Sequence, residues 1–432
     1  MDVVMTSPAW LKVGVTFGAI LAANVAGLPL GAAILVFSLV LALWSGLGVM
    51  GTAALFTSFS RPENYLLPPA VLLLLFFTES LGRTGRIEAT METLGGYLRD
   101  RRLLLAGLPA LVGLLPMPGG ALFSAPLVAA ADGRNDLDGA TKGAVNYWFR
   151  HLWEYWWPLY PGVILAVRYS GLPLWLYMAA MIPFTLVAFA GGYLFILRPI
   201  GRQEKEGRKG ERRPPLRLPA LGPIMILVTL SLAGSLVLPL LGWRGTAASL
   251  LAMIAGLAVA LPIVFRGAET ALTPSLAVLR KGATWNMILL VAAIQVFSFC
   301  LTAPLPGGGT LVAVMRDEFV AAGVPLVALM MVIPFISGLV TGVAFGFVGA
   351  SFPIIFALLG ADPPAATAVA ATVLSYSFGY IGMMLSPLHV CYVVTCEYFG
   401  TSLFAVYPRL IGPAATVLAA GTSLAAAVYL SF

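Results

Sequence analysis

Charged residues are scarce in this sequence. Only 10% of its 432 residues are Asp, Glu, Lys or Arg, whereas 60% are hydrophobic. A soluble protein carries about 25% charged residues, and a soluble core could not bury so much apolar surface. The mean hydropathy of +0.95 agrees with this reading. The composition therefore excludes an ordinary soluble domain and predicts an all-α polytopic membrane protein in contact with membrane lipid.

Cysteine is also rare, and its spacing is uninformative. Cys300, Cys391 and Cys396 lie in apolar segments without a C-x-x-C pattern. We therefore expect no disulfide framework, no metal site and no cofactor, and we interpret these residues as small buried apolar groups. The N-terminus lacks the basic region and the small-residue cleavage site of a secretory signal. We accordingly expect no cleaved signal peptide.

Basic residues outnumber acidic ones, giving a net charge of +7, but their distribution does not indicate a nucleic-acid partner. Eight of the 25 basic residues lie between Arg198 and Arg217. The stretch 199–217 is charged and lacks apolar periodicity, so we interpret it as a flexible cytoplasmic linker between two halves, 1–198 and 218–432. A patch that binds anionic lipid is the alternative.

Long apolar runs predict the membrane spans, because about 20 apolar residues cross the hydrocarbon core. Candidate spans occupy residues 10–26, 30–57, 65–82, 144–168, 173–197, 218–241, 246–265, 284–303, 365–399 and 406–430.

Two further apolar segments, 103–131 and 324–359, do not fit single spans. Each consists of two short arms interrupted by a Gly-rich or Pro-rich sequence, "PMPGG" in the first and "GVAFG" in the second. Arms this short do not cross a core about 30 Å thick. We therefore predict two re-entrant hairpins, and irregular backbone at that depth is tolerated only where protein or a wet cavity covers it.

The order of these segments repeats. Asn146-Tyr-Trp-Phe follows the first hairpin and Ser375-Tyr-Ser-Phe follows the second, each with a proline twelve residues later. The four segments 83–102, 132–142, 198–217 and 266–283 hold 18 of the 25 basic residues, and placing them in the cytoplasm makes the hairpins enter from opposite sides. The sequence thus predicts two inverted-topology repeats, each with about five spans and one hairpin, and both termini outside.

Four motifs carry a resemblance to a known family: "LLPMPGGALFSAPLV", "SGLVTGVAFGFVGASFPII", "HLWEYWWPLYPG" and "LSPLHVCYVVTCEYF". Over nearly its whole length the chain resembles the prokaryotic family called domain of unknown function 401. It is similar in layout to the ion transporter superfamily, which includes divalent-anion/sodium symporters and gluconate and arsenite permeases. The resemblance implies secondary transport in the inner membrane, an elevator-like movement and a homodimer. The hairpin tips lack the Ser-Asn-Thr of the divalent-anion symporters, so neither dicarboxylate specificity nor sodium coupling follows.

The stretch "NYWFRHLWEYWWPLYPG" places charges where a membrane interior is expected. On a helix Asn146, Arg150 and Glu154 would share one face that ends at Pro158, and a charge at the bilayer centre costs about 2.5–3.5 kcal/mol. We expect Arg150 to bind an anionic group and His151 or Glu154 to carry a coupling ion, H⁺ or Na⁺. Backbone carbonyls released by the prolines could bind a cation or a solute. An Arg150–Glu154 structural pair and an interfacial aromatic belt are the alternatives.

The hairpins and the second broken span supply the other candidate solute-binding residues. Hairpin glycines let backbone amides at a helix N-terminus approach an anion, with close helix packing as the alternative. The second broken span repeats the prolines but not the charges. The remaining candidates are Pro118, Gly119, Gly120, Ser124, Gly349, Ser351, Ser386 and His389.

These observations favour a secondary active transporter for a small, anionic organic solute. The first alternative is a cation/proton antiporter that uses Glu154 and His151. A channel and a membrane-embedded enzyme are more remote, because the sequence has no G-x-S-x-G motif, no H-E-x-x-H motif and no paired intramembrane aspartates. We therefore expect no enzymatic activity.

Overall fold

The computed structural model is helical throughout its described residues and has no β-strand there. It describes residues 7–48, 59–86, 89–90, 93, 100–114, 120–133, 136–201, 219, 221–243, 245–266, 272–360 and 362–430. The predicted linker 199–217 lies almost entirely outside these residues, as do Pro118 and Gly119. The division of the chain into halves at this linker stays a prediction.

Seven helical segments in the described part are long and apolar enough to cross a membrane. A helix can span the hydrocarbon core because its backbone hydrogen bonds are formed within the segment itself. These spans confirm the predicted all-helical membrane fold. They are α5 and α6 (Pro62–Tyr65, Leu67–Arg83), α12 with η1 (Leu174–Gly192, Tyr193–Leu197), α13 with η2 (Leu221–Val237, Leu238–Leu241), α14 (Gly245–Phe265), α16 (Gly282–Thr302), α20 (Ala365–Met384) and α22 (Leu403–Leu430).

The N-terminal helices are shorter than the predicted runs. Helix α2 (Ala9–Val25) and helix α3 (Leu30–Trp44) have 17 and 15 residues, so the run 30–57 is not one helix, and residues 49–58 lie outside the described part. Another helix, α17 (Leu311–Ala321), was not predicted and meets the following helix at an angle of 118°. Its Glu318 accepts hydrogen bonds from the backbone N–H groups of Ala9 and Trp10 at 2.9 and 2.8 Å, which ties α17 to the start of α2.

Both predicted hairpins are present as pairs of short packed helices. The first consists of α8 (Arg101–Val112) and α9 (Gly120–Ala131), with 12 residues each, or about 18 Å per arm. The second consists of α18 (Leu326–Thr341) and α19 (Ala344–Leu359), which are joined through Gly342 at a φ of +63°. Glycine adopts this left-handed conformation at little steric cost, so the chain can reverse within two residues.

Each predicted Pro-broken span is divided into two helices. The first is α10 (Gly139–Arg150) followed by α11 (Pro161–Ser170), and the second is α20 followed by α21 (Val390–Tyr398). Helices α11 and α21 begin at positions 161 and 390, which matches the offset between Asn146 and Ser375 in the repeated motif. Proline at the start of α11 explains the boundary, because its ring fixes φ for a first helical turn.

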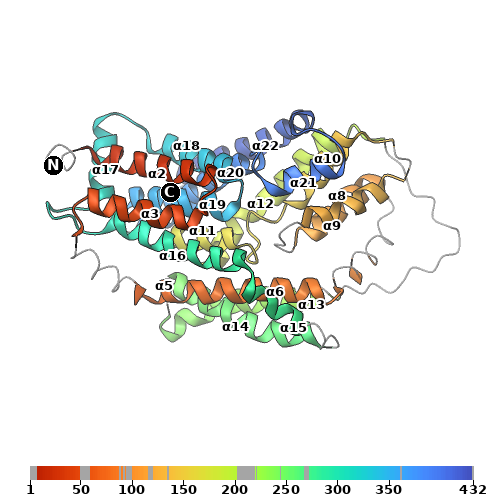
Figure 1. Ribbon diagram of the computed structural model, residues 1–432, viewed down its shortest axis with the longest axis horizontal. Helices are drawn as coiled ribbons and strands as arrows, with labels where there is room; N and C mark the ends of the chain where they lie inside the picture. Colours follow the sequence, from red (N-terminus) through yellow and green to blue (C-terminus); the bar gives the residue numbers. More distant parts are fainter. Residues whose placement is uncertain are drawn as a thin grey trace.

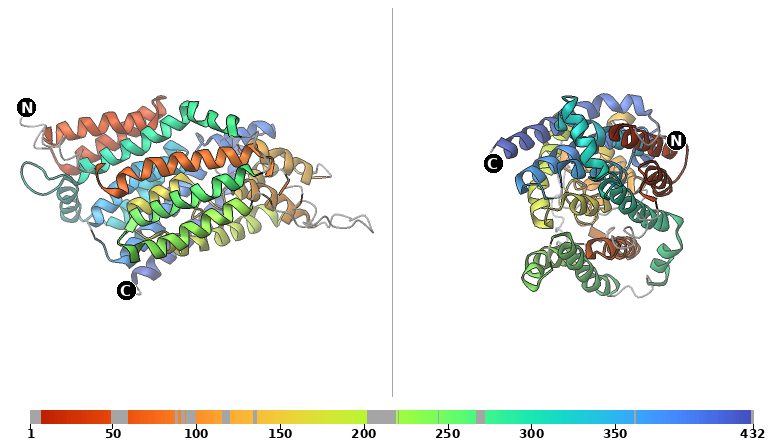
Figure 2. Two further views of the ribbon diagram at one scale, coloured as in Figure 1. Left: turned by 90° about the horizontal axis from the view of Figure 1, so that it is seen from below. Right: turned by 90° about the vertical axis from the view of Figure 1, so that its left-hand side faces the viewer.

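The hairpins and the broken spans pack crosswise. Helix α9 of the first hairpin packs against α21, and helix α19 of the second hairpin packs against α11. Figure 1 shows α8, α9, α10 and α21 grouped together, while α6, α13 and α14 form a separate layer along the lower side. The views of Figure 2 show most helices running roughly along the long axis of the molecule. The buried residues between these groups form one continuous apolar cluster.

Candidate functional site

Each hairpin contacts the helix that precedes a break, at equivalent positions of the repeat. A Cβ atom added to Gly113 in the first hairpin would lie 1.9 Å from the carbonyl oxygen of Arg150, and one added to Gly338 in the second would lie 2.1 Å from that of Gly379. Arg150 and Gly379 are equivalent positions of the repeated motif. Only glycine fits such close approaches of backbone to backbone, so both hairpins are held against the broken spans by the same device.

The first break begins earlier than the sequence predicted. Helix α10 ends at Arg150, and residues 151–156 form turns. The expectation that Asn146, Arg150 and Glu154 share one helical face is therefore wrong for Glu154, which lies beyond the helix. Proline at 158 disfavours helical backbone in the residue before it. The non-helical segment begins at residue 151, several residues earlier than this effect alone requires.

The aromatic side chains of this break are buried or half-buried, and three of them donate hydrogen bonds to carbonyls at the end of α8. Trp153 Nε1 and Trp157 Nε1 donate hydrogen bonds to the carbonyl oxygens of Ala110 and Leu114 at 2.7 and 3.0 Å, and the hydroxyl of Tyr160 donates to the carbonyl of Gly113. The last carbonyls of a helix have no partner within it. The aromatic residues thus satisfy the free carbonyl groups at the end of α8 in the first hairpin. This role differs from that of an interfacial aromatic belt.

Arg150 is buried where the first hairpin meets the two broken spans. Only 2% of its surface is exposed, and its Nη1 lies 3.3 Å from Cys391 Sγ in α21. A Cβ added at Gly120, the first residue of α9, would lie 2.2 Å from Arg150 Nη2. The absence of a side chain at Gly120 therefore lets the guanidinium lie against the start of α9. A helix N-terminus carries partial positive charge. The start of α9 and the guanidinium of Arg150 therefore place two positive groups side by side in a buried location.

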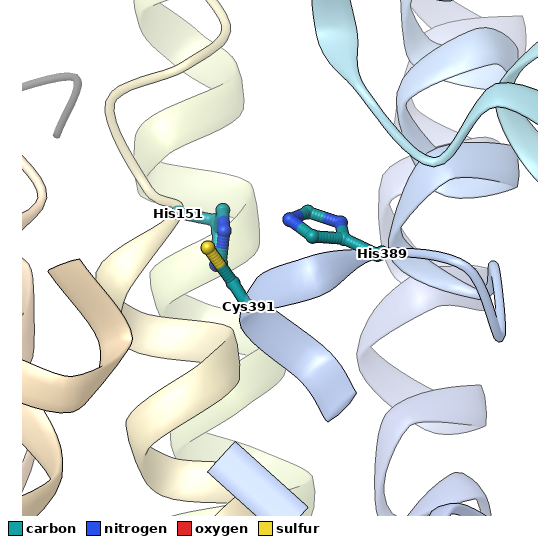
Figure 3. Close-up of side chains that lie close together, drawn as sticks. All are labelled: His151, His389 and Cys391. Atoms are coloured by element: carbon teal, nitrogen blue, oxygen red, sulfur yellow. The ribbon is translucent and has the colours of Figure 1, made fainter. Parts of the chain in front are cut away.

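Two histidines lie beside this arginine. His151 Nε2 is 3.8 Å from Glu154 Oε1, and the rings of His151 and His389 are 4.9 Å apart at an angle of 82°. The hydroxyl of Tyr147 lies 3.0 Å from His389 Nδ1. Figure 3 shows His151, His389 and Cys391 converging from two separate segments of the chain. The structure thus brings together Arg150, His151, Glu154 and His389, and their role in a site stays a prediction.

Two carbonyls released by the break are already hydrogen-bonded. The hydroxyl of Tyr376 donates to the carbonyl of Glu154 at 2.6 Å, and the hydroxyl of Tyr380 donates to that of His151. Both tyrosines belong to α20. These two oxygens are therefore satisfied by protein, in contrast to the predicted role of released carbonyls as ligands, and the break is held to the second repeat.

Asn146 links three elements at the same level. Its Nδ2 donates to the carbonyl of Ala121 in α9 at 3.3 Å and to Thr395 Oγ1 in α21 at 3.0 Å. Its Oδ1 is buried and has no hydrogen-bond partner within the described residues. A buried acceptor without a partner costs free energy, so this amide oxygen is available to a bound solute.

The other predicted residues have packing contacts of their own. Ser124 Oγ and Ser351 Oγ donate to carbonyls one turn earlier in their helices. A Cβ at Gly349 would lie 2.3 Å from Ile294 Cδ1 of α16, and Ser386 Oγ donates to the carbonyl of Leu339 at 2.6 Å. Gly349 thus serves close helix packing, the alternative that the sequence left open.

Three site residues were missed by the sequence analysis. Cys391, Tyr147 and Tyr380 all contact the residues predicted for the first break. The repeat offered a signal for one of them, because Tyr380 occupies the position equivalent to His151. Cys391 was expected to be a small buried apolar group, and nothing in the local spacing of Tyr147 marks a site.

A network of ion pairs lies at the connection between α9 and α10, outside the spans. Arg101 at the start of α8 pairs with Asp132 and Asp136, and Lys142 Nζ lies 3.5 Å from Asp132. The hydrogen bond from Arg101 lowers the pKa of Asp136. The hydrogen bond from Thr141 at the start of α10 lowers the pKa of Asp138, which also pairs with Arg409 at 2.8 Å. The carboxylates thus bind the first hairpin to α10 and α22.

Comparison with known proteins finds one matching family model and a solved structure of similar fold. The family model described as "Protein of unknown function (DUF401)" matches residues 16–430. The solved structure of the YdaH transporter of Alcanivorax borkumensis, described as having an unusual topology, is similar with a TM-score of 0.58 and 14% sequence identity. The match covers 89% of this chain and 90% of that chain. No match was found among curated proteins. The chain thus has a fold similar to that of a transporter from another organism.

Proposed function

The chain belongs to the family described as "Protein of unknown function (DUF401)", and from its site we propose that it is a secondary active transporter of a small anionic organic solute. The observation that carries this proposal is the buried guanidinium of Arg150 beside the first residue of α9. An anion bound there would contact both the guanidinium and the N-terminus of α9, which favours negative charge.

The neighbouring groups suit the remainder of such a solute. Asn146 presents a buried amide oxygen, and Tyr155 presents a buried hydroxyl without a hydrogen-bond partner in the described part of the chain. Aromatic rings of Tyr155 and Tyr380, 4.1 Å apart between centroids, line the same break. A carboxylate attached to a short organic body with hydrogen-bonding groups would match these contacts.

The coupling ion is H⁺ in this proposal. His151 and Glu154 form a buried pair with 3.8 Å between Nε2 and Oε1. One member of such a pair can bind a proton while the other stabilises it. Sodium prefers a cage of oxygen ligands, and the carbonyls of His151 and Glu154 are occupied by tyrosine hydroxyls. The arrangement therefore supports a proton over Na⁺.

The packing of the hairpins supports alternating access. Each hairpin contacts the broken span of the other half through α9 with α21 and α19 with α11. A movement of these elements against the long helices would expose the site to either side of the membrane in turn. We extend the proposal to an elevator-like movement in a homodimer of the prokaryotic inner membrane, as the family resemblance implies.

Ligand binding to variants of Arg150 tests the anion site. A thermal-shift screen of small organic anions on the purified protein identifies the solute, and titration gives its Kd. Arg150→Gln is expected to weaken binding by about 10- to 150-fold, the equivalent of a charge-assisted hydrogen bond of about 1.5–3 kcal/mol. Arg168→Gln is the matched control, because Arg168 of α11 donates instead to Asn64 Oδ1 at 2.6 Å. Unchanged affinity in Arg150→Gln would refute the site.

A cation/proton antiporter is the second candidate, because the same His151–Glu154 pair could bind a cation and a proton in turn. Proteoliposomes distinguish the two functions. Exchange of Na⁺ or K⁺ for H⁺ without any organic solute would support the antiporter, whereas ion-driven accumulation of the solute supports the proposal.

A further inference from the structure

Two buried histidines and a half-buried cysteine from different parts of the chain form a cluster. His151 lies in the first break, His389 immediately precedes α21, and Cys391 is the second residue of α21. One ligand atom from each lies within 4.8 Å of the other two. His151 and His389 expose 1% and 6% of their surfaces. Figure 3 shows the three side chains facing a common centre.

The hydrogen bond of His151 fixes which ring nitrogen faces the cluster with a lone pair. Its Nδ1 lies 2.6 Å from the carbonyl oxygen of Tyr147. A carbonyl oxygen only accepts, so Nδ1 carries the proton in the neutral ring and Nε2 presents a lone pair. This Nε2 is buried and has no hydrogen-bond partner in the described part of the structure. It is therefore available to a Lewis acid.

Tyr147 sets the same tautomer in His389. The tyrosine hydroxyl lies 3.0 Å from the carbonyl oxygen of Met384 and 3.0 Å from His389 Nδ1. Because the carbonyl must accept the hydroxyl proton, the hydroxyl oxygen accepts from Nδ1–H of His389. The Nε2 of His389 is then the lone-pair nitrogen, and Figure 3 shows the ring of His389 directed at His151. Metal-binding histidines characteristically donate their other N–H to an oxygen in this way.

We propose that His151, His389 and Cys391 form a site for a divalent transition-metal ion of the zinc and cobalt class. Imidazole nitrogen and thiolate sulfur are the ligands that such ions prefer, whereas Mg²⁺ and Ca²⁺ prefer oxygen. Zinc bonds to nitrogen and sulfur are about 2.0–2.3 Å long, so each ligand atom would move inward by less than about 1 Å from the present spacing of up to 4.8 Å. Small side-chain rotations provide that movement.

The surrounding charges are compatible with a bound cation. A cysteine binds a metal as its thiolate, and Arg150 Nη1 at 3.3 Å from Cys391 Sγ stabilises negative charge on that sulfur. The thiolate of Cys391 would then offset part of the positive charge of the ion, and Glu154 would stay available for the coupling proton.

The site would join the two broken spans, because one ligand comes from the first repeat and two come from the second. Local spacing could not predict it: 238 residues separate His151 from His389. The proposal replaces the expectation of no metal site. It goes beyond the proposed transport function and does not depend on it, since metal binding is measured on the purified protein without a solute.

Cobalt spectroscopy on the purified full-length chain tests the proposal. After treatment with a chelator, titration with Co²⁺ is expected to give one ion per chain, with tetrahedral d–d absorption and a near-ultraviolet sulfur-to-cobalt charge-transfer band. Cys391→Ser should abolish the charge-transfer band. Cys396→Ser is the matched control, because Cys396 is a buried cysteine of the same helix outside the cluster, and it should retain the band.

Variants of the histidines provide an independent measurement. His389→Gln is expected to weaken Co²⁺ binding at least tenfold. Tyr147→Phe removes the nearer acceptor of His389 Nδ1–H and leaves the carbonyl oxygen of Met383 at 3.4 Å, so it should weaken binding by less than His389→Gln does. Thermal unfolding without metal verifies that each variant folds. Absence of stoichiometric binding, or equal charge-transfer bands in the wild type and Cys391→Ser, would overturn the proposal. Solute uptake by the same preparation would still be measurable, so this failure is distinguishable from failure of the transport function.

Discussion

The most informative single substitution is Gly120→Ala, because it displaces Arg150 without removing its charge. The new Cβ would lie 2.2 Å from Nη2 and 2.9 Å from Cζ of Arg150. An ordinary contact requires about 3.5 Å, so the guanidinium must move by about 1 Å. The end of a flexible side chain can make this movement, and we therefore expect the fold to survive while the anion site loses its geometry.

The expected loss follows from the contact at stake. A charge-assisted hydrogen bond contributes about 1.5–3 kcal/mol, so its loss should raise the Kd of the anionic solute by about 10- to 150-fold. The assay is titration of the solute found by the thermal-shift screen, with the unfolding temperature as a check on folding.

Two glycine substitutions serve as controls. Gly349→Ala makes a comparable collision, 2.3 Å from Ile294 Cδ1, but away from Arg150, and should leave the Kd unchanged. Gly113→Ala meets the backbone carbonyl of Arg150 at 1.9 Å, which cannot move alone, so it should lower stability by about 1–3 kcal/mol or more. Wild-type affinity in Gly120→Ala, or an equal loss in Gly349→Ala, would refute the reasoning.

Three further predictions concern stability, measured by thermal unfolding in detergent. Asp132→Asn removes the buried partner of Arg101 and should cost about 3–5 kcal/mol; an unchanged unfolding temperature would contradict this. The pKa values of Asp136 and Asp138 are lowered from 3.8, so their stabilisation is present above that pH and is lost as pH falls through the folded values; Asp138→Asn should flatten this acid dependence, and an identical profile would argue against it. Tyr380→Phe removes the shorter of two hydrogen bonds to the carbonyl of His151 and leaves only the backbone N–H of Glu154 at 3.4 Å, so it should cost about 1 kcal/mol, unlike Tyr398→Phe at an exposed position.

Local sequence patterns were sufficient to predict most of the long helical elements, but not α17. The hairpin arms were expected at 103–131 and 324–359, and the structure has α8 with α9 and α18 with α19 there. Apolar length and Pro or Gly interruptions report on segments of the chain itself, so they survive without knowledge of neighbours. The end of α10 at Arg150 was missed, because the contacts of the following aromatics with α8 fix that boundary.

The site was only half predictable for the same reason. Arg150, His151 and Glu154 stand out as charges within an apolar stretch, and an intramembrane charge marks function by its cost alone. Cys391 and Tyr147 carry no such signal, and their roles arise from contacts across more than 200 positions of the chain. Gly349 and Gly120 looked alike in the sequence, since both are hairpin glycines. Only the tertiary structure shows that Gly349 packs against Ile294 whereas Gly120 lies against Arg150.

Proton-driven uptake in proteoliposomes tests the central claim most directly. With a proton gradient directed into the vesicles, the wild-type protein is predicted to concentrate the anionic solute inside them. Uptake should stop when an ionophore dissipates the gradient. Glu154→Gln, which removes the ionisable group beside His151, should bind the solute but fail to concentrate it. A protein that binds the anion and never accumulates it under any ion gradient would contradict the account.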